Sequence, residues 1–169
     1  MNARYLTFLG LAAIALIVVL AACVDPREGY APVQPIAFSH QLHAGANQVP
    51  CQYCHVGPGQ GPMSSVPSVN TCMNCHSQVA TTQPEIQKIH AAWKSGTPIE
   101  WVKVYDLPDF VRFSHQPHIN KGFECAECHG DVAKMDVITT VNDFNMGWCV
   151  DCHRAPENQA PTDCVTCHY

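Results

Sequence analysis

The chain has 169 residues, a formal net charge of -5, 13 prolines and 10 glycines. This length fits one domain, the density of proline and glycine argues against long helices or a regular sheet, and the acidic balance argues against nucleic acid as a partner. Eleven cysteines in so short a chain would ordinarily indicate disulfide bonds or zinc sites.

The first predicted element is apolar. Residues 5–24 carry no charge, and twenty helical residues at about 1.5 Å each cover about 30 Å, the thickness of a bilayer core. Because Arg4 precedes this run, the positive-inside rule weakly places the N-terminus in the cytoplasm. We expect residues 1–24 to form an uncleaved transmembrane anchor. Alternatively, the sequence LAAC ending at Cys23 resembles a lipoprotein processing site, at which Cys23 would be lipidated.

Residues 25–37 are rich in proline, which predicts an extended linker. Residues 38–169 then form the main domain, in which one short pattern occurs twice. The sequence FSHQLH at residues 38–43 and the sequence FSHQPH at residues 113–118 both read F-S-H-Q-x-H. This repetition indicates a duplicated unit.

Between the two halves lies an insert, residues 77–111. A helix is predicted from Pro84 to just before Gly96, since proline favours the first helical turn and glycine the end. Its apolar residues Ile86, Ile89 and Trp93 share a stripe with His90. Residues 99–107 are β-branched and aromatic, which predicts a short extended segment ended by Pro108.

Ten cysteines fall into five copies of Cys-x-x-Cys-His, here numbered motifs 1 to 5: residues 51–55, 72–76, 125–129, 149–153 and 164–168. Two thiols three positions apart reach two vinyl groups on one porphyrin edge, and the next histidine places its imidazole over the iron. We therefore predict five covalently bound haem c groups. The predicted attachment residues are Cys51, Cys54, Cys72, Cys75, Cys125, Cys128, Cys149, Cys152, Cys164 and Cys167. The predicted proximal ligands are His55, His76, His129, His153 and His168.

This prediction also defines the fold class: a mostly irregular, loop-rich chain with short helices, wrapped around five haems, plus one N-terminal transmembrane helix. Zinc is the competing interpretation, because paired Cys-x-x-Cys hairpins bind it tetrahedrally. Five hairpins leave one without a mate, and zinc does not explain a histidine after every hairpin. Thioredoxin-like chemistry would need a βαβ pattern, which no motif has around it.

Five histidines remain, one for each haem, which is the number that bis-histidine ligation requires. They are His40, His43, His90, His115 and His118. The paired histidines before motifs 1 and 3 resemble those of the small cytochromes of the c3 and c7 type. The resemblance implies that His40 serves the haem of His55 and His115 that of His129, while the second histidine of each pair reaches a different haem.

His90 stands outside these pairs, and its helix face turns it inward, where a buried imidazole needs a partner. We predict that it is a distal iron ligand, with a hydrogen bond to backbone as the alternative. Methionine is the other common sixth ligand and raises the reduction potential. One His/Met haem therefore stays open, with four candidates in the haem domain: Met63, Met73, Met135 and Met146.

With the apolar N-terminus, the stretch from HAAWKSGTPIEWVKVYDLPDFVRFSHQPH to NMGWCVDCH resembles the pentahaem cytochrome subunit of alternative complex III. The resemblance implies a non-catalytic electron-transfer subunit at the cell membrane, a single-pass protein with its haem domain on the outer side. It further implies integral quinol-binding subunits and an iron–sulfur subunit as partners. Electrons would pass from menaquinol to another cytochrome c, a small redox carrier or a terminal oxidase.

The second interpretation is a stand-alone membrane-anchored quinol dehydrogenase that feeds a periplasmic reductase. That family often has a methionine soon after the first motif, whereas Val56 follows His55 here. A pentahaem nitrite reductase is a weaker interpretation again, because no motif has lysine in place of histidine.

Overall fold

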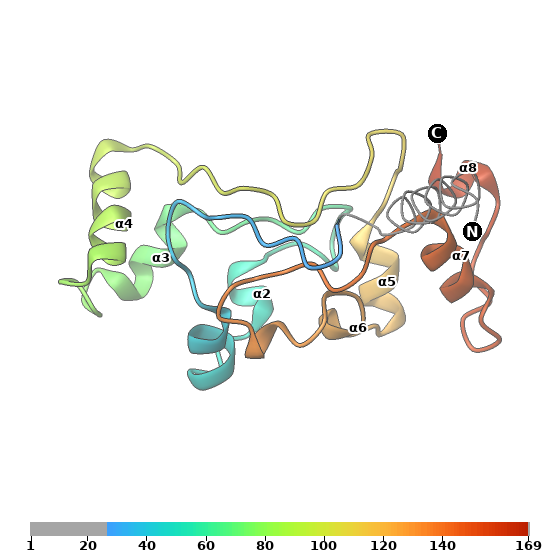
Figure 1. The fold of residues 1–169 in the computed structure, drawn as a ribbon, viewed down its shortest axis with the longest axis horizontal. Helices are drawn as coiled ribbons and strands as arrows, with labels where there is room; N and C mark the ends of the chain where they lie inside the picture. The colour runs from blue at the N-terminus through green and yellow to red at the C-terminus, as the bar shows by residue number, and fades with distance from the viewer. Residues whose placement is uncertain (1–26, 169) are drawn as a thin grey trace, which may run out of the picture.

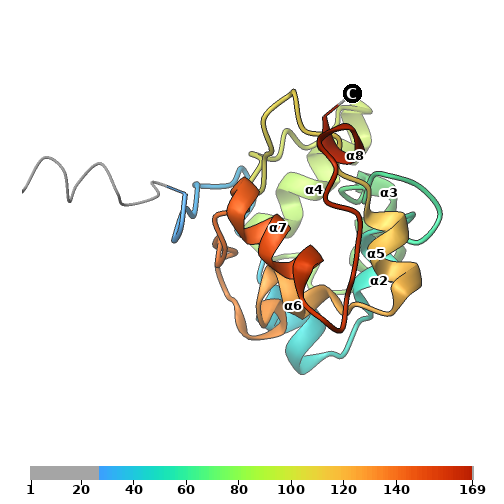
Figure 2. The same cartoon turned by 90° about the vertical axis from the view of Figure 1, so that its right-hand side faces the viewer.

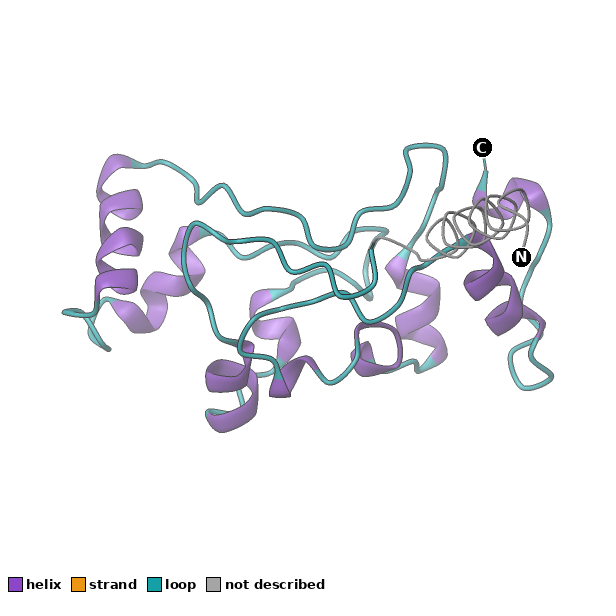
Figure 3. Cartoon of the chain, in the orientation of Figure 1, coloured by secondary structure: helices purple, strands orange, loops and turns teal. Residues whose placement is uncertain are grey.

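The structure, a computed structural model, describes residues 27–168 as an elongated chain of short helices joined by loops (Figure 1). The described residues contain no β-strand (Figure 3), in agreement with the predicted loop-rich fold. In chain order the elements are the π-helical turn η1 (Gln41–Ala46), α2 (Cys51–Cys54), α3 (Val69–His76), α4 (Pro84–Ser95), α5 (His115–Lys121), α6 (Cys125–His129), the 3-10 turn η2 (Val132–Lys134), α7 (Met146–Arg154) and α8 (Cys164–Cys167).

Every Cys-x-x-Cys sequence forms a helical turn, within α2, α3, α6, α7 and α8. In motifs 1 and 5 the histidine closes this turn, because its N–H donates to the carbonyl of the first cysteine at 2.9 Å. Residues three apart in a helix lie on the same face, so each turn presents its two thiols together. The local sequence therefore supplies the geometry that attachment to one porphyrin edge requires.

Helix α4 follows the prediction. Pro84 occupies its first turn, and the helix ends at Ser95 before Gly96, whose φ of 69° is a left-handed conformation that glycine adopts without strain. Ile89 is buried, and α4 packs against α3. The segment at residues 99–107 forms no strand. Instead the side-chain amide of Gln34 pairs with both the N–H and the carbonyl of Val102.

The described residues 27–37 of the proline-rich segment form neither helix nor strand, and they are bound to the domain along their length. Gly29 and Tyr30 exchange backbone hydrogen bonds with Thr140, whose buried side chain also accepts from the Tyr30 N–H at 3.0 Å. Further along, Glu85 of α4 accepts from the N–H of Ala37 at 2.8 Å. The described part of this segment therefore ties the second half of the chain to the insert.

The turns η1 and η2 lie backbone against backbone. η1 packs against η2, and a side chain at Gly45 would collide with the backbone carbonyl of Ala133. Across residues 27–168 the buried apolar side chains are Ile36, Pro58 and Ile89. Such a chain needs a source of stability other than an aliphatic core.

No helix between residues 27 and 168 is long and apolar enough to cross a bilayer. The predicted anchor at residues 1–24 lies outside the described part of the chain, so it stays a prediction.

Candidate haem-binding sites

The structure brings eight histidines together as four pairs of imidazole rings. The ring centres lie 6.4 Å apart in the first and third pairs, 6.0 Å in the second and 5.9 Å in the fourth. In chain order the pairs are His40 with His55, His43 with His76, His115 with His129, and His118 with His153. Each pair joins a motif histidine to one from an F-S-H-Q-x-H sequence.

These spacings fit two imidazoles bound to one metal atom. A metal–imidazole bond is about 2 Å long and the ring centre lies about 1 Å behind the nitrogen, so two such ligands have ring centres about 6 Å apart. The four observed spacings run from 5.9 to 6.4 Å. The first four motifs can therefore each provide a cysteine turn and two axial imidazoles for a haem.

Hydrogen bonds set the orientation of most of these rings. In seven histidines, Nδ1 lies 2.6 to 3.1 Å from a backbone carbonyl. A carbonyl only accepts, so Nδ1 carries the proton and Nε2 is left as the electron-pair donor for a metal. The seven are His43, His55, His76, His115, His118, His153 and His168.

The duplicated units have the same internal geometry, including a residue whose role the sequence analysis missed. Phe38 meets the edge of His40, at 83° between the rings, and stacks on His43 with a centroid distance of 4.3 Å. Phe113 meets His115 at 82° and lies 4.9 Å from His118. The phenylalanine that opens each F-S-H-Q-x-H sequence thus packs against both histidines, a role that its recurrence in the two copies could have suggested.

Burial keeps two of the paired imidazoles neutral. It lowers the pKa of His40 to about 4, helped by the neighbouring imidazoles of His55 and His43. The pKa of His129 is also lowered, by burial first and then by His115 and His55. Only neutral imidazole has the free electron pair that a metal needs, so both rings are ready to act as ligands.

The motifs do not follow one another in space as they do in sequence. Burial raises the pKa of five motif thiols, and in each of them the next cause is a thiol of another motif. These neighbours are Cys75 for Cys54, Cys54 for Cys72, Cys51 for Cys125, Cys152 for Cys128 and Cys167 for Cys149. The spatial order is therefore motif 2, 1, 3, 4, 5. Figure 1 shows the same order along the long axis, from α3 through α2 and α6 to α7 and α8.

Two histidines belong to no pair. His90 donates from Nε2 to the carbonyl of His76 at 2.8 Å, which is the backbone partner given above as the alternative to iron, and its role as a distal ligand stays a prediction. His168 donates from Nδ1 to the carbonyl of Phe110 and lies 5.9 Å from the phenyl ring of that residue. His90 on α4 and His168 beside α8 lie at opposite ends of the molecule (Figure 1).

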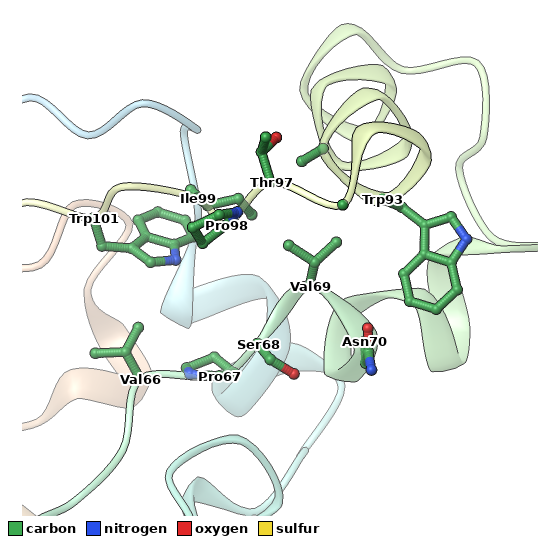
Figure 4. Close-up of a pocket in the computed structure, with 12 residues that line it drawn as sticks. Val66, Pro67, Ser68, Val69, Asn70, Trp93, Thr97, Pro98, Ile99 and Trp101 are labelled. Carbon is green, nitrogen blue, oxygen red and sulfur yellow. The ribbon is translucent and has the colours of Figure 1, made fainter.

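A shallow pocket of about 500 Å³ adjoins the start of α3. Figure 4 shows its largely apolar lining, including Val66, Val69, Pro98 and Trp101, and no cysteine or histidine takes part.

Among residues 27–168, no three Cys, His, Asp or Glu side chains converge on a point where a metal ion could bind, and the ten motif cysteines are free thiols. The metal-binding chemistry of the described residues therefore lies in the motifs and the paired imidazoles.

Comparison with known protein families divides the chain into the same two halves as the duplicated F-S-H-Q-x-H units. The family model for the class III cytochrome C family matches residues 20–104, and the model for cytochrome c7 and related cytochrome c matches residues 111–169. The multiheme cytochrome c subunit of menaquinone reductase from Nitratidesulfovibrio vulgaris (strain Hildenborough) is 31% identical over 160 residues, which cover 80% of this chain and 76% of that protein.

Together these findings define the class: a multihaem cytochrome c, in which haem is bound covalently and the function is electron transfer. Within it, the chain belongs to the class III and c7 cytochrome family, alongside the menaquinone reductase subunit. The predicted resemblance to the c3 and c7 cytochromes is thereby confirmed.

Proposed function

We propose that this chain is the electron-conducting subunit of a membrane complex that exchanges electrons with menaquinone, and that it carries five haems. Haem iron, when bound at the motifs, would supply the one-electron chemistry. The residues of the chain attach, orient and space these centres. The observation that carries the proposal is the line of five motifs, since it provides a continuous path along the long axis of the protein.

The direction of flow that we favour is that of alternative complex III, in which menaquinol is oxidised. Menaquinol then loses two electrons and two protons at a neighbouring membrane subunit, the protons leave on the outer side, and the electrons pass one at a time along the motifs to a carrier or an oxidase. Four imidazole pairs leave no open metal position at motifs 1 to 4, which supports conduction rather than substrate chemistry there.

This role requires attachment to the outer face of the cell membrane, which the apolar residues 5–24 would provide. We also propose integral quinol-binding subunits and an iron–sulfur subunit as partners. The opposite direction, menaquinone reduction, is a second candidate, because the relative from N. vulgaris bears that activity in its name.

The test is to purify the native complex gently, identify its subunits, and mix it without oxygen with a water-soluble menaquinol analogue while recording the haem α-band. We expect a multi-subunit complex whose haems become reduced, and an isolated chain whose haems do not. Reduction of the isolated chain by the quinol would instead establish a stand-alone quinol dehydrogenase. Haems that accept electrons only from a reduced cytochrome, with menaquinone becoming reduced, would establish the second candidate.

A further inference from the structure

The duplicated architecture accounts for four motifs and leaves the fifth different. Each F-S-H-Q-x-H unit supplies two histidines, the first unit to motifs 1 and 2 and the second to motifs 3 and 4. No third unit exists in the sequence, and motif 5 is an appended single turn, α8. Within residues 27–168, the aromatic neighbour of His168 is Phe110, whose phenyl ring has no atom that can bind iron.

The remaining histidine, His90, is in the wrong place and the wrong state to serve motif 5. It lies on α4, at the end of the molecule opposite α8 (Figure 1). Its Nε2 carries a proton, because it donates to the carbonyl of His76. All ten histidines of the chain are thereby assigned, so the second axial ligand of motif 5 has to come from another residue type.

Methionine is the natural candidate for this ligand. The described part of the chain has four methionines, and their positions relative to motif 5 distinguish them. Met73 lies inside motif 2, and Met135 lies beside η1, where its carbonyl accepts from Gln41. Met63 follows Pro62, whose carbonyl accepts from His115, next to motif 3. These contacts place all three beside motifs 1 to 3.

Met146 opens α7, one helical turn before Cys149, and the thiol of Cys149 is a neighbour of Cys167 in motif 5. Helices α7 and α8 lie at the same end of the long axis in Figure 1, and both are on the side that faces the viewer in Figure 2. Met146 is 71% exposed, so packing against the rest of the protein does not explain an apolar residue at this position.

We propose that the thioether of Met146 is the distal ligand at motif 5. Motif 5 would then hold the one His/Met haem, and motifs 1 to 4 would hold the four bis-histidine haems. The inference rests on the proposed function, since it assumes a haem at every motif. Methionine raises the potential of a haem relative to imidazole, so electrons would collect at the α8 end. That end would then face the electron acceptor during menaquinol oxidation.

The experiment compares three variants of the full-length holoprotein: Met146→Leu, Met63→Leu and His90→Ala. The readouts are the haem-to-protein ratio, near-infrared magnetic circular dichroism, which separates His/Met from bis-histidine ligation, and CO binding to the reduced protein. We expect the native protein to show one His/Met signal among five haems. Met146→Leu should abolish that signal and let one haem in five bind CO, whereas the other two variants should leave the spectra unchanged.

A fourth variant, Met146→His, guards against a folding defect. It should convert the His/Met signal into a fifth bis-histidine signal and lower the midpoint potential of one component in a redox titration. An unchanged spectrum in both Met146 variants would overturn the inference, as would a haem that becomes high-spin in His90→Ala. A ratio below five haems in the native protein would instead overturn the proposed function, so the two failures are distinguishable.

Discussion

At the residue scale, the two nitrogens of each histidine perform different tasks. Seven rings direct Nδ1 at a carbonyl and keep Nε2 for a metal, whereas His90 uses Nε2 for its hydrogen bond. The tautomer of a metal-binding histidine is set by the partner of its second nitrogen. This choice of nitrogen separates His90 from the others, a distinction that residue counting cannot make because ten histidines for five irons matches bis-histidine ligation throughout.

Phe38 gives a residue-scale prediction. Replacing it with leucine removes the ring that packs against both His40 and His43, contacts of a type that contribute roughly 1 kcal/mol each. Both imidazoles gain rotational freedom, so we expect the electron paramagnetic resonance signals of two haems to broaden or shift while the haem count is unchanged.

The matched variant is Phe113→Leu, which should alter two different haems, because Phe113 packs against His115 and His118. If both variants changed the same signals, or if neither changed any, the phenylalanines would not orient the axial ligands.

At the element scale, the features that depend on neighbouring residues were predicted from the sequence, and those that depend on residues far apart in the chain were not. Pro84 and Gly96 mark the two ends of helix α4 as predicted, because each residue acts within one turn of the backbone. The Cys-x-x-Cys turns are local in the same way. By contrast, residues 99–107 have the composition of a strand, but their backbone pairs with the side chains of Gln34 and Arg27 instead of with a second strand. The attachment of the proline-rich segment to Thr140 joins residues 110 apart, which no local pattern encodes.

Gly45 provides a test of the contact between η1 and η2. A methyl group there meets the carbonyl of Ala133, and because backbone cannot move aside cheaply, we expect Gly45→Ala to lower the free energy of unfolding by about 1–3 kcal/mol. Thermal unfolding of the holoprotein, followed by circular dichroism, measures the change. Gly61→Ala is the control, since nothing lies within 4 Å of its added atom. Equal stability of the two variants would contradict the close packing.

At the scale of the whole molecule, the spatial order of the motifs differs from the order in the chain. Motif 2 lies at one end and motif 1 in the interior, between motifs 2 and 3. The motifs are visible in the sequence, but their spatial order is not, because it depends on how the two halves meet: Cys51 of the first half lies beside Cys125 of the second. Motif 2 and motif 5 are therefore the terminal sites, where electrons would enter and leave.

We propose that all five motifs of this chain carry covalently attached haem. Thioether bonds survive unfolding, so the intact mass of the denatured, fully matured chain measures attachment directly, whatever the fold or the axial ligands. We expect a mass equal to that of the polypeptide plus five haems, one for each Cys-x-x-Cys-His sequence. A mass corresponding to four haems or fewer would contradict it.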